Sequence, residues 1–243
     1  MRNRSPANLD VVDRTTFQSA IDGLRVREKA HTREGDAIAA ARRRLPMVKV
    51  DPASRLVSYR GTVTLLDAFE GRRQLISYYF MWRPGRPAAQ QCEGCTFFTS
   101  QIRELSTLHA KDVTYATFCQ GPYDESERYR QFMGWDLPWY AVPDASLARL
   151  LDGRPAGRMY LICYLRQGDE VFETYWTTRR GVEAMDNNYH LLDLTLYGRQ
   201  QEWEDSPAGW PQDPEGMTTE GRPTSQWPRL AAGCSDDLTA HAS

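Results

Sequence analysis

The sequence contains no long hydrophobic segment. No stretch approaches the roughly 18 apolar residues that a membrane-spanning helix needs, and the first residues lack the apolar core of a secretory signal peptide. The five cysteines are too few and too unevenly spaced for a disulfide framework. We therefore expect a cytoplasmic protein without membrane association. In that reducing compartment, thiols stay reduced unless they do chemistry or bind metal.

A net charge of −2 conceals an uneven distribution of charged residues. Residues 1–60 carry 13 Lys and Arg against 7 Asp and Glu, whereas the remaining residues carry 17 against 25. The densest basic cluster, Arg42 to Arg44, falls at the end of a predicted helix, where cations complement the helix dipole. We therefore predict that nucleic acid is not a partner.

The hydrophobic periodicity changes along the chain. Thr15 to about Leu45 has helical spacing, with Phe17, Ala20, Ile21 and Leu24 on one apolar face, and Gly35 as a point where the helix could divide in two. From Met47 the pattern favours short strands. The runs "QLISYYFMW" (residues 74–82) and "DVTYATFC" (residues 112–119) are typical of strands buried on both faces of a sheet.

Further helical patterns and a hairpin follow along the chain. They predict a helix from Cys92 to about Lys111, helices over 124–134 and 145–153, a β-hairpin around Gln167-Gly168-Asp169, and a last helix near 181–196. This order of elements predicts an α/β protein with a mixed sheet. The segment from about Gln200 is rich in Pro, Gly and Trp and predicts an irregular strap or a disordered end.

The stretch "CEGC", Cys92 to Cys95, follows a predicted strand and opens a predicted helix. The first turn of a helix presents unpaired N–H groups and a positive dipole end, so a Cys92 thiolate would be stabilised there and become nucleophilic. Cys95 would lie about 5–6 Å away on the same face and could resolve a mixed disulfide. Gly94 leaves the approach open, and Glu93 would tune the reduction potential.

Two other interpretations of the cysteine pair stay open. A zinc site needs two further ligands, for which Cys119, Cys163, His109 and His190 are scattered candidates. Two reduced, buried cysteines could also serve packing alone. Phe97 and Phe98 follow the pair directly; helical spacing favours core packing for both, with Phe97 a candidate for the substrate edge.

Several segments carry a family resemblance. In this order, "RRRLPMVKV", "LISYYFMW", "CEGCTFF", "KDVTYATFCQGP", "YRQFMGWDLPWY" and "LLDLTLYGRQ" resemble the DUF899 family, bacterial proteins described as predicted thioredoxin-like dithiol-disulfide oxidoreductases. The resemblance implies a thioredoxin-like mixed β-sheet flanked by helices, in the peroxiredoxin-like branch. It implies a redox role for Cys92 and Cys95. We accordingly predict an N-terminal helical extension (1–45), a thioredoxin-like domain (46–199) and an irregular tail (200–243).

The sequence departs from the thioredoxin pattern at one place. Thioredoxins have a cis-proline before the hairpin strand that faces the CxxC, whereas "AGRMYLICYL" has no proline there, and Met159 or Tyr160 takes the place. This departure weakens a general protein-disulfide role and leaves zinc open. In "MGWDLPWYAV", Trp135, Pro138, Trp139 and Tyr140 could form an aromatic wall that contacts an apolar substrate or partner, or this loop could simply pack tightly into the core.

We predict a thiol-disulfide oxidoreductase in which Cys92 attacks, Cys95 resolves and the Cys92–Cys95 disulfide replaces a cofactor. The predicted partners are a disulfide-containing protein, or a small oxidised thiol or peroxide, and a cellular dithiol reductant. The substrate-binding candidates are Glu93, Gly94, Phe97, Trp82, Trp135, Pro138 and Trp139. The alternatives are a thiol peroxidase and a binding module with metal at the CxxC. The N-terminal helix and the Trp-rich tail suit a homodimer arm or an intrachain strap equally.

Overall fold

The computed structural model describes residues 9–239, and the chain divides into two compact units. One unit comprises the residues up to Pro46 together with Asp205–Gln212. The other comprises Met47–Glu204 and the residues from Asp213 onward. Within residues 9–239, no helix is long and apolar enough to cross a membrane.

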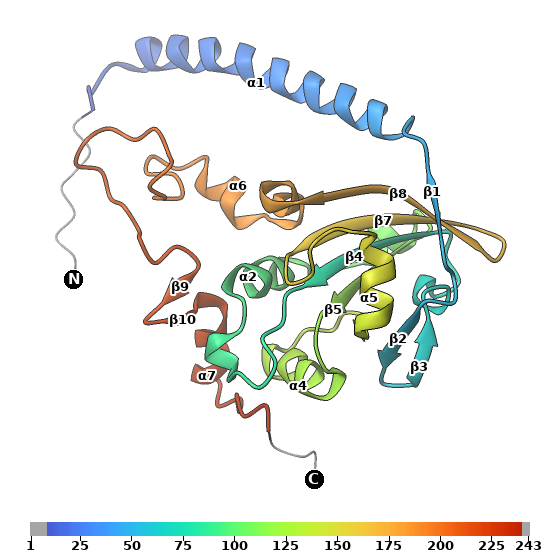
Figure 1. The fold of residues 1–243 in the computed structure, drawn as a ribbon. Coiled ribbons are helices and arrows are strands. Elements are labelled where there is room, and N and C mark those ends of the chain that lie inside the picture. Colours follow the sequence, from blue (N-terminus) through green and yellow to red (C-terminus); the bar gives the residue numbers. More distant parts are fainter. Residues whose placement is uncertain (1–8, 240–243) are drawn as a thin grey trace. The chain divides into compact units, whose positions relative to one another are not determined.

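The N-terminal unit contains one long helix, α1 (Arg14–Arg42) (Figure 1). Asp13 caps it by accepting a hydrogen bond from the Thr16 amide. The expected division at Gly35 is wrong: the helix continues through it, because a helical glycine costs only about 1 kcal/mol relative to alanine, too little to end a helix of 29 residues. None of the residues of α1 is buried, so the predicted apolar face, including Phe17 and Leu24, is exposed.

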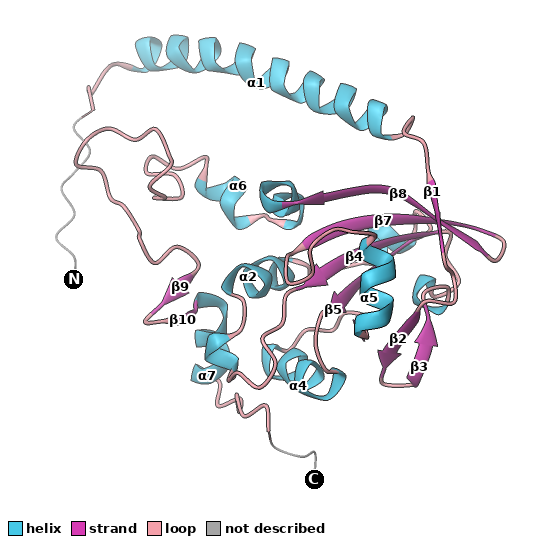
Figure 2. Ribbon diagram, viewed as in Figure 1, coloured by secondary structure: helices cyan, strands magenta, loops and turns pink. Residues whose placement is uncertain are grey.

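The larger unit is built on an eight-stranded mixed sheet with the order β1-β8-β7-β4-β5-β6-β2-β3. The strands are β1 (Val48–Val50), β2 (Arg55–Ser58), β3 (Gly61–Thr64), β4 (Gln74–Phe80), β5 (Val113–Cys119), β6 (Trp139–Ala141), β7 (Tyr160–Gln167) and β8 (Glu170–Thr178). β4 pairs in parallel with β5 and antiparallel with β7, which forms the predicted hairpin with β8. These strands and the helices around them (Figure 2) confirm the predicted mixed β-sheet flanked by helices.

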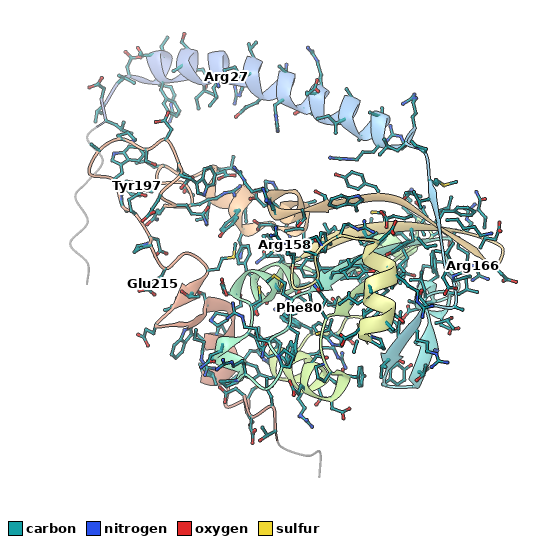
Figure 3. The ribbon with its side chains drawn as sticks, viewed as in Figure 1. Arg27, Phe80, Arg158, Arg166, Tyr197 and Glu215 are labelled. Atoms are coloured by element: carbon teal, nitrogen blue, oxygen red, sulfur yellow. The ribbon has the colours of Figure 1, made fainter. Side chains whose placement is uncertain are left out.

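Strand β4 is buried on both faces of the sheet, as its apolar composition predicts. Because side chains alternate along a strand, Tyr78 and Phe80 enter one core cluster while Leu75 and Tyr79 enter the other. The Phe80 ring, labelled in Figure 3, lies 5.4 Å from that of Trp139, centroid to centroid. The first cluster also contains the two cysteines of the CxxC, so the same packing that fixes β4 fixes the candidate site.

Helices cover both faces of the sheet. They are α2 (Glu93–Gln101), α3 (Ser106–His109), α4 (Tyr123–Met133) and α5 (Asp144–Leu151), with short 3-10 turns η1 (Asp67–Phe69) and η2 (Ala88–Gln90). Buried side chains of α2 and α4 belong to the cluster with Phe80, whereas those of α5 belong to the cluster with Tyr79.

The single helix predicted from Cys92 to about Lys111 is wrong. Helix α2 ends at Gln101, Ile102 is extended, and α3 starts at Ser106. The Glu104 carboxylate accepts a hydrogen bond from the Ser106 amide at 2.7 Å, and such a local bond competes with continuation of the first helix.

The chain after the hairpin is less regular. The helix predicted near 181–196 is instead a 3-10 segment, η3 (Arg179–Met185), followed by α6 (Asn188–Leu192). The break coincides with Asp186, whose Oδ1 accepts a hydrogen bond from the Tyr189 amide; Asn187 is the N-cap residue of the second helix. The tail is largely irregular and carries β9 (Thr218–Thr219), β10 (Arg222–Pro223), η4 (Thr224–Gln226) and α7 (Trp227–Ala231).

Candidate functional site

The two cysteines of the CxxC lie together at the first turn of α2. Cys92 is the N-cap residue, and its Sγ accepts a hydrogen bond from the Cys95 amide at 3.3 Å. Both are free thiols; Cys92 is 4% exposed and Cys95 is fully buried. The sulfur of Cys92 therefore occupies the position where unpaired N–H groups and the helix dipole favour an anion.

The surroundings make the two thiols chemically different. The Cys95 thiol hydrogen-bonds to the Cys92 sulfur and, with the Cys95 amide and the nearby Arg83 guanidinium, lowers the pKa of Cys92, against the effect of burial and of Glu93. Complete burial raises the pKa of Cys95 well above its usual range, and the neighbouring Cys92 raises it further. Cys92 is thus the better thiolate, and Cys95 holds its proton more tightly.

Strand β4 supplies the groups that hold Cys95. The Met81 amide, directly after β4, donates to Cys95 Sγ at 3.3 Å. The buried Tyr78 hydroxyl also hydrogen-bonds to the Cys95 thiol, and burial raises the pKa of Tyr78 well above its usual range. Both groups are donors to a Cys95 thiolate, so they would stabilise it once it forms.

The loop between β4 and Cys92 is fastened by one buried side chain. The Gln91 amide group donates to the Arg83 and Arg86 carbonyls at 3.0 Å each, and its carbonyl accepts from the Arg83 amide at 3.1 Å. Arg83 in turn reaches toward Glu93, with a nitrogen–oxygen distance of 3.9 Å. These contacts fix the path of the backbone from β4 into the first turn of α2.

A hydrogen-bonded chain connects the cysteine turn with the tail. Thr96 Oγ1 donates to the Cys92 carbonyl at 2.8 Å and lies 2.6 Å from the Tyr129 hydroxyl. Gln226 Nε2 donates to the same hydroxyl at 2.7 Å and to the Ala88 carbonyl at 2.8 Å. The tail segment η4 is therefore attached to the site through buried polar groups.

Three methionines surround the cysteine turn. Met81 Sδ lies 3.9 Å from Cys92 Sγ. A Cβ placed on the buried Gly94 would lie 3.2 Å from Met159 Cε and 3.6 Å from Met217 Sδ, so these side chains pack directly on the glycine. Met159, from the residue directly before β7, thus contacts the cysteine turn.

A surface pocket of about 460 Å³ lies beside the first turn of α2. Its lining includes Arg83, Arg86, Gln90, Glu93, Thr218 and Pro223, so the loop before Cys92 and the tail share it. Of the predicted substrate-binding residues, Glu93 lines this pocket and Gly94 lies beneath the two methionines.

The other predicted substrate-binding residues lie in different surroundings. Phe97 is partly buried and packs against Tyr189 with tilted rings, 4.7 Å between ring centroids. The buried indoles of Trp82, Trp135 and Trp139 donate hydrogen bonds to Glu125, Ser100 and Ser126, respectively.

Pro138 lines a separate pocket with Asp136 and Tyr140. A substrate role for the aromatic residues stays a prediction.

The scattered candidates for a zinc site are spread over the fold. Cys119 is buried at the end of β5, and Cys163 lies on β7. His109 is the last residue of α3. His190 lies in α6, and its ring bonds to the carbonyl of Asp186, which precedes that helix. Over residues 9–239, no group of three or more His, Cys, Asp or Glu side chains is arranged to hold a metal ion.

Several site residues were not anticipated from the sequence: Tyr78, Met81, Arg83, Gln91, Met217 and Gln226. Tyr78 and Met81 fall in a run that reads as uniform core, and nothing in its pattern separates them from Tyr79 or Phe80. Gln91 carried a signal, because a polar side chain directly before a helix N-terminus commonly bonds to nearby backbone groups. The tail residues lie more than 100 positions from Cys92 in the sequence, and only the tertiary fold brings them close.

Comparisons with known proteins agree with the family resemblance. Residues 6–230 match the sequence profile of DUF899, described as "Bacterial protein of unknown function". No curated protein matches the sequence.

Among solved structures, reduced Prx3 of Vibrio vulnificus in complex with H2O2 is similar, with 15% identity and a TM-score of 0.40 over 60% of this chain and 99% of that one. A putative thiol:disulfide interchange protein DsbE of Chlorobium tepidum has 14% identity and a TM-score of 0.39, over 58% and 94% of the two chains. A thioredoxin of Wuchereria bancrofti has 15% identity and a TM-score of 0.34, over 57% and 90%.

Proposed function

The chain belongs to the DUF899 family, and from this premise and the geometry of its cysteine pair we propose that it is a thiol-disulfide oxidoreductase. One observation carries the proposal: Cys92 caps α2 with its sulfur bonded to both the amide and the thiol of Cys95. This arrangement favours a thiolate at Cys92 and keeps a second thiol within reach of it.

In the first step, the Cys92 thiolate attacks one sulfur of a substrate disulfide. A Cys92–substrate disulfide forms, the substrate S–S bond breaks, and the other substrate sulfur leaves as a thiolate. Arg83, near Cys92, and the helix N-terminus favour the attacking anion.

In the second step, Cys95 loses its proton and attacks the Cys92 sulfur. The internal disulfide forms, and the second substrate sulfur leaves as a thiolate, so two electrons pass to the substrate. Once Cys92 is in a mixed disulfide, it no longer raises the pKa of Cys95, while the Tyr78 hydroxyl and the Met81 amide still favour the Cys95 thiolate. A cellular dithiol would then reduce the Cys92–Cys95 pair and regenerate the protein.

The test is the reduction of a model disulfide by the reduced, full-length protein with no other thiol present. We expect the parent to reduce one disulfide per chain, Cys92→Ser to reduce none, and Cys95→Ser to stop at one mixed disulfide per chain. Reduction by Cys92→Ser as complete as by the parent would overturn the proposal.

The burial of Cys92 favours a second candidate, a thiol peroxidase. With the residue only 4% exposed and Met81 against its sulfur, a small oxidant reaches Cys92 more easily than a folded protein does. The thiolate would attack a peroxide oxygen, the O–O bond would break, and an alcohol or water would leave. The Cys92 sulfenic acid would then condense with Cys95 to a disulfide and water. Peroxide consumption measured beside disulfide reduction on the same preparation distinguishes the two reactions.

A further inference from the structure

Three sulfur atoms from two elements meet at the cysteine turn. Cys92 Sγ lies 3.9 Å from Met81 Sδ, and it interacts directly with the Cys95 thiol. The Met81 amide bonds to Cys95 Sγ at 3.3 Å, which holds the methionine backbone against the second cysteine. Two thiols and one thioether therefore lie at the same turn.

The spacing of Cys92 Sγ and Met81 Sδ fits two ligands of a three-coordinate metal ion. With metal–sulfur bonds of about 2.3 Å, three sulfurs around one ion lie about 4 Å apart. The observed 3.9 Å between Cys92 Sγ and Met81 Sδ already matches one edge of that triangle. Methionine has three rotatable bonds, so its sulfur can adjust to the ion without movement of the backbone.

We propose that Cys92, Cys95 and Met81 form a binding site for Cu(I). Thiolates and thioethers are soft ligands, and this donor combination selects Cu(I) among biological metals. The site goes beyond the proposed oxidoreductase function, since binding needs no disulfide substrate and no electron transfer. One Cu(I) ion replaces the protons of two thiols, both protons pass to water, and copper keeps its oxidation state.

The surroundings suit such an ion. Cu(I) with two thiolates and a neutral thioether leaves a single negative charge, and the Arg83 guanidinium lies close enough to Cys92 to offset it in part. Met159 and Met217 pack on Gly94 between the two cysteines and add apolar, polarizable sulfur around the site. Met81 is only partly buried, which leaves a route for Cu(I) from a donor in solution.

The test is an anaerobic competition titration of the reduced, full-length protein against the Cu(I)–bicinchoninate complex. We expect the protein to withdraw one Cu(I) per chain from the chelator, and Cys92→Ser and Cys95→Ser to abolish the withdrawal. Met81→Leu, which keeps the volume of the side chain, should weaken binding by about tenfold or more. Met133→Leu, a methionine of α4 in the same core cluster, is the matched control and should bind like the wild type.

X-ray absorption of the wild-type complex supplies a measurement that does not depend on the folding of a variant. Three sulfur neighbours at about 2.3 Å are expected. Two sulfur neighbours, unchanged affinity in Met81→Leu, or no withdrawal of Cu(I) would each overturn the site.

The reduction potential of the cysteine pair, measured on metal-free protein, tests the oxidoreductase proposal separately. A reversible disulfide without Cu(I) withdrawal removes only the copper site, whereas Cu(I) withdrawal without a reversible disulfide supports the site and removes only the oxidoreductase function.

Discussion

The backbone amide of Met81 donates a hydrogen bond to the sulfur of Cys95, although 14 positions separate the two residues in the sequence. This bond joins the end of β4 to the first turn of α2 and fixes the Cys95 thiol in the core. Cys92, at the cap of the same helix, keeps its small exposed surface. The two cysteines therefore differ in access and in proton affinity, and this difference predicts distinct behaviour in reactions with thiol reagents.

The first prediction concerns the order of attack by the two thiols. In a protein in which the partly buried Cys163 and Cys234 are alanine, an aromatic disulfide such as 5,5′-dithiobis(2-nitrobenzoate) should react at Cys92. Cys95 should then expel the bound group, so two thionitrobenzoate ions are released per chain. With Cys95→Ala, one ion should be released and the adduct should persist in the mass spectrum.

The control for this experiment is Cys119. Burial raises the pKa of its thiol to about 12, so it should stay unmodified throughout. An adduct that forms at Cys95 in the Cys92→Ala protein as fast as the adduct at Cys92 forms in the Cys95→Ala protein would contradict the assigned roles.

The second prediction is a pH dependence. Because the Cys95 thiol and amide lower the pKa of Cys92, its thiolate persists at a pH where an unperturbed thiol is protonated. Alkylation of Cys92 by iodoacetamide should therefore reach half its maximal rate at a lower pH than alkylation of a free thiol.

The Cys95→Ala protein tests the cause of this shift. It loses the thiol donor, which is the largest influence, and keeps the backbone N–H, so the midpoint should move up toward the ordinary value. Peptide mapping at each pH follows Cys92 alone. A midpoint in Cys95→Ala equal to or below that of the parent would show that the thiol contact does not stabilise the Cys92 thiolate.

Much of this architecture could be predicted because its signals are local. A continuous apolar run gives β4, Gly134 with its positive φ ends α4, and a glycine turn joins β7 to β8. The family resemblance, carried by the order of short motifs, is confirmed by the match over residues 6–230.

The predicted helices were wrong where side chains compete with the helical backbone for hydrogen bonds. Contacts between segments that are distant in the sequence could not be predicted at all. The Glu104 and Asp186 carboxylates each accept a hydrogen bond from an amide two or three positions further on, at the places where a continuous helical pattern breaks. The position of Met217 over Gly94 depends on how a tail segment packs, and no periodicity in the sequence contains that information.

The third prediction tests the attachment of the tail. Gln226 is fully buried, and its amide nitrogen donates to the Ala88 carbonyl and the Tyr129 hydroxyl. Gln226→Ala should lower the free energy of unfolding by about 1–3 kcal/mol, because both hydrogen bonds of the buried amide nitrogen are lost. Urea unfolding followed by circular dichroism measures the change.

Gln131 provides the control for the tail variant. Its side chain bonds to Glu127 on an exposed part of α4, and Gln131→Ala should change stability by less than about 0.5 kcal/mol. Equal stability of the Gln226→Ala protein and the parent would mean that the tail does not contribute to the fold through this contact.

The fourth prediction concerns the contact between Gly121 and the Trp82 indole, which follows Met81 in the chain. A Cβ added to Gly121 would lie 2.1 Å from Cδ1 of the Trp82 indole, far inside contact distance. The indole cannot move freely, because it is buried and its Nε1 donates to Glu125 at 3.1 Å. Gly121→Ala should therefore destabilise the protein by about 1–3 kcal/mol, as overpacking of a core does.

Two further variants assign this cost to the indole. Gly23→Ala is the matched control: its Cβ meets nothing within 4 Å inside α1, so alanine should be neutral or stabilise the helix by up to about 1 kcal/mol. Trp82→Ala removes Cδ1 and Cγ, which a Cβ at position 121 would meet at 2.1 and 2.4 Å, so adding Gly121→Ala to the Trp82→Ala protein should cost less than adding it to the parent. If the two changes are simply additive in urea unfolding, the Trp82 indole is not the group that requires glycine at position 121.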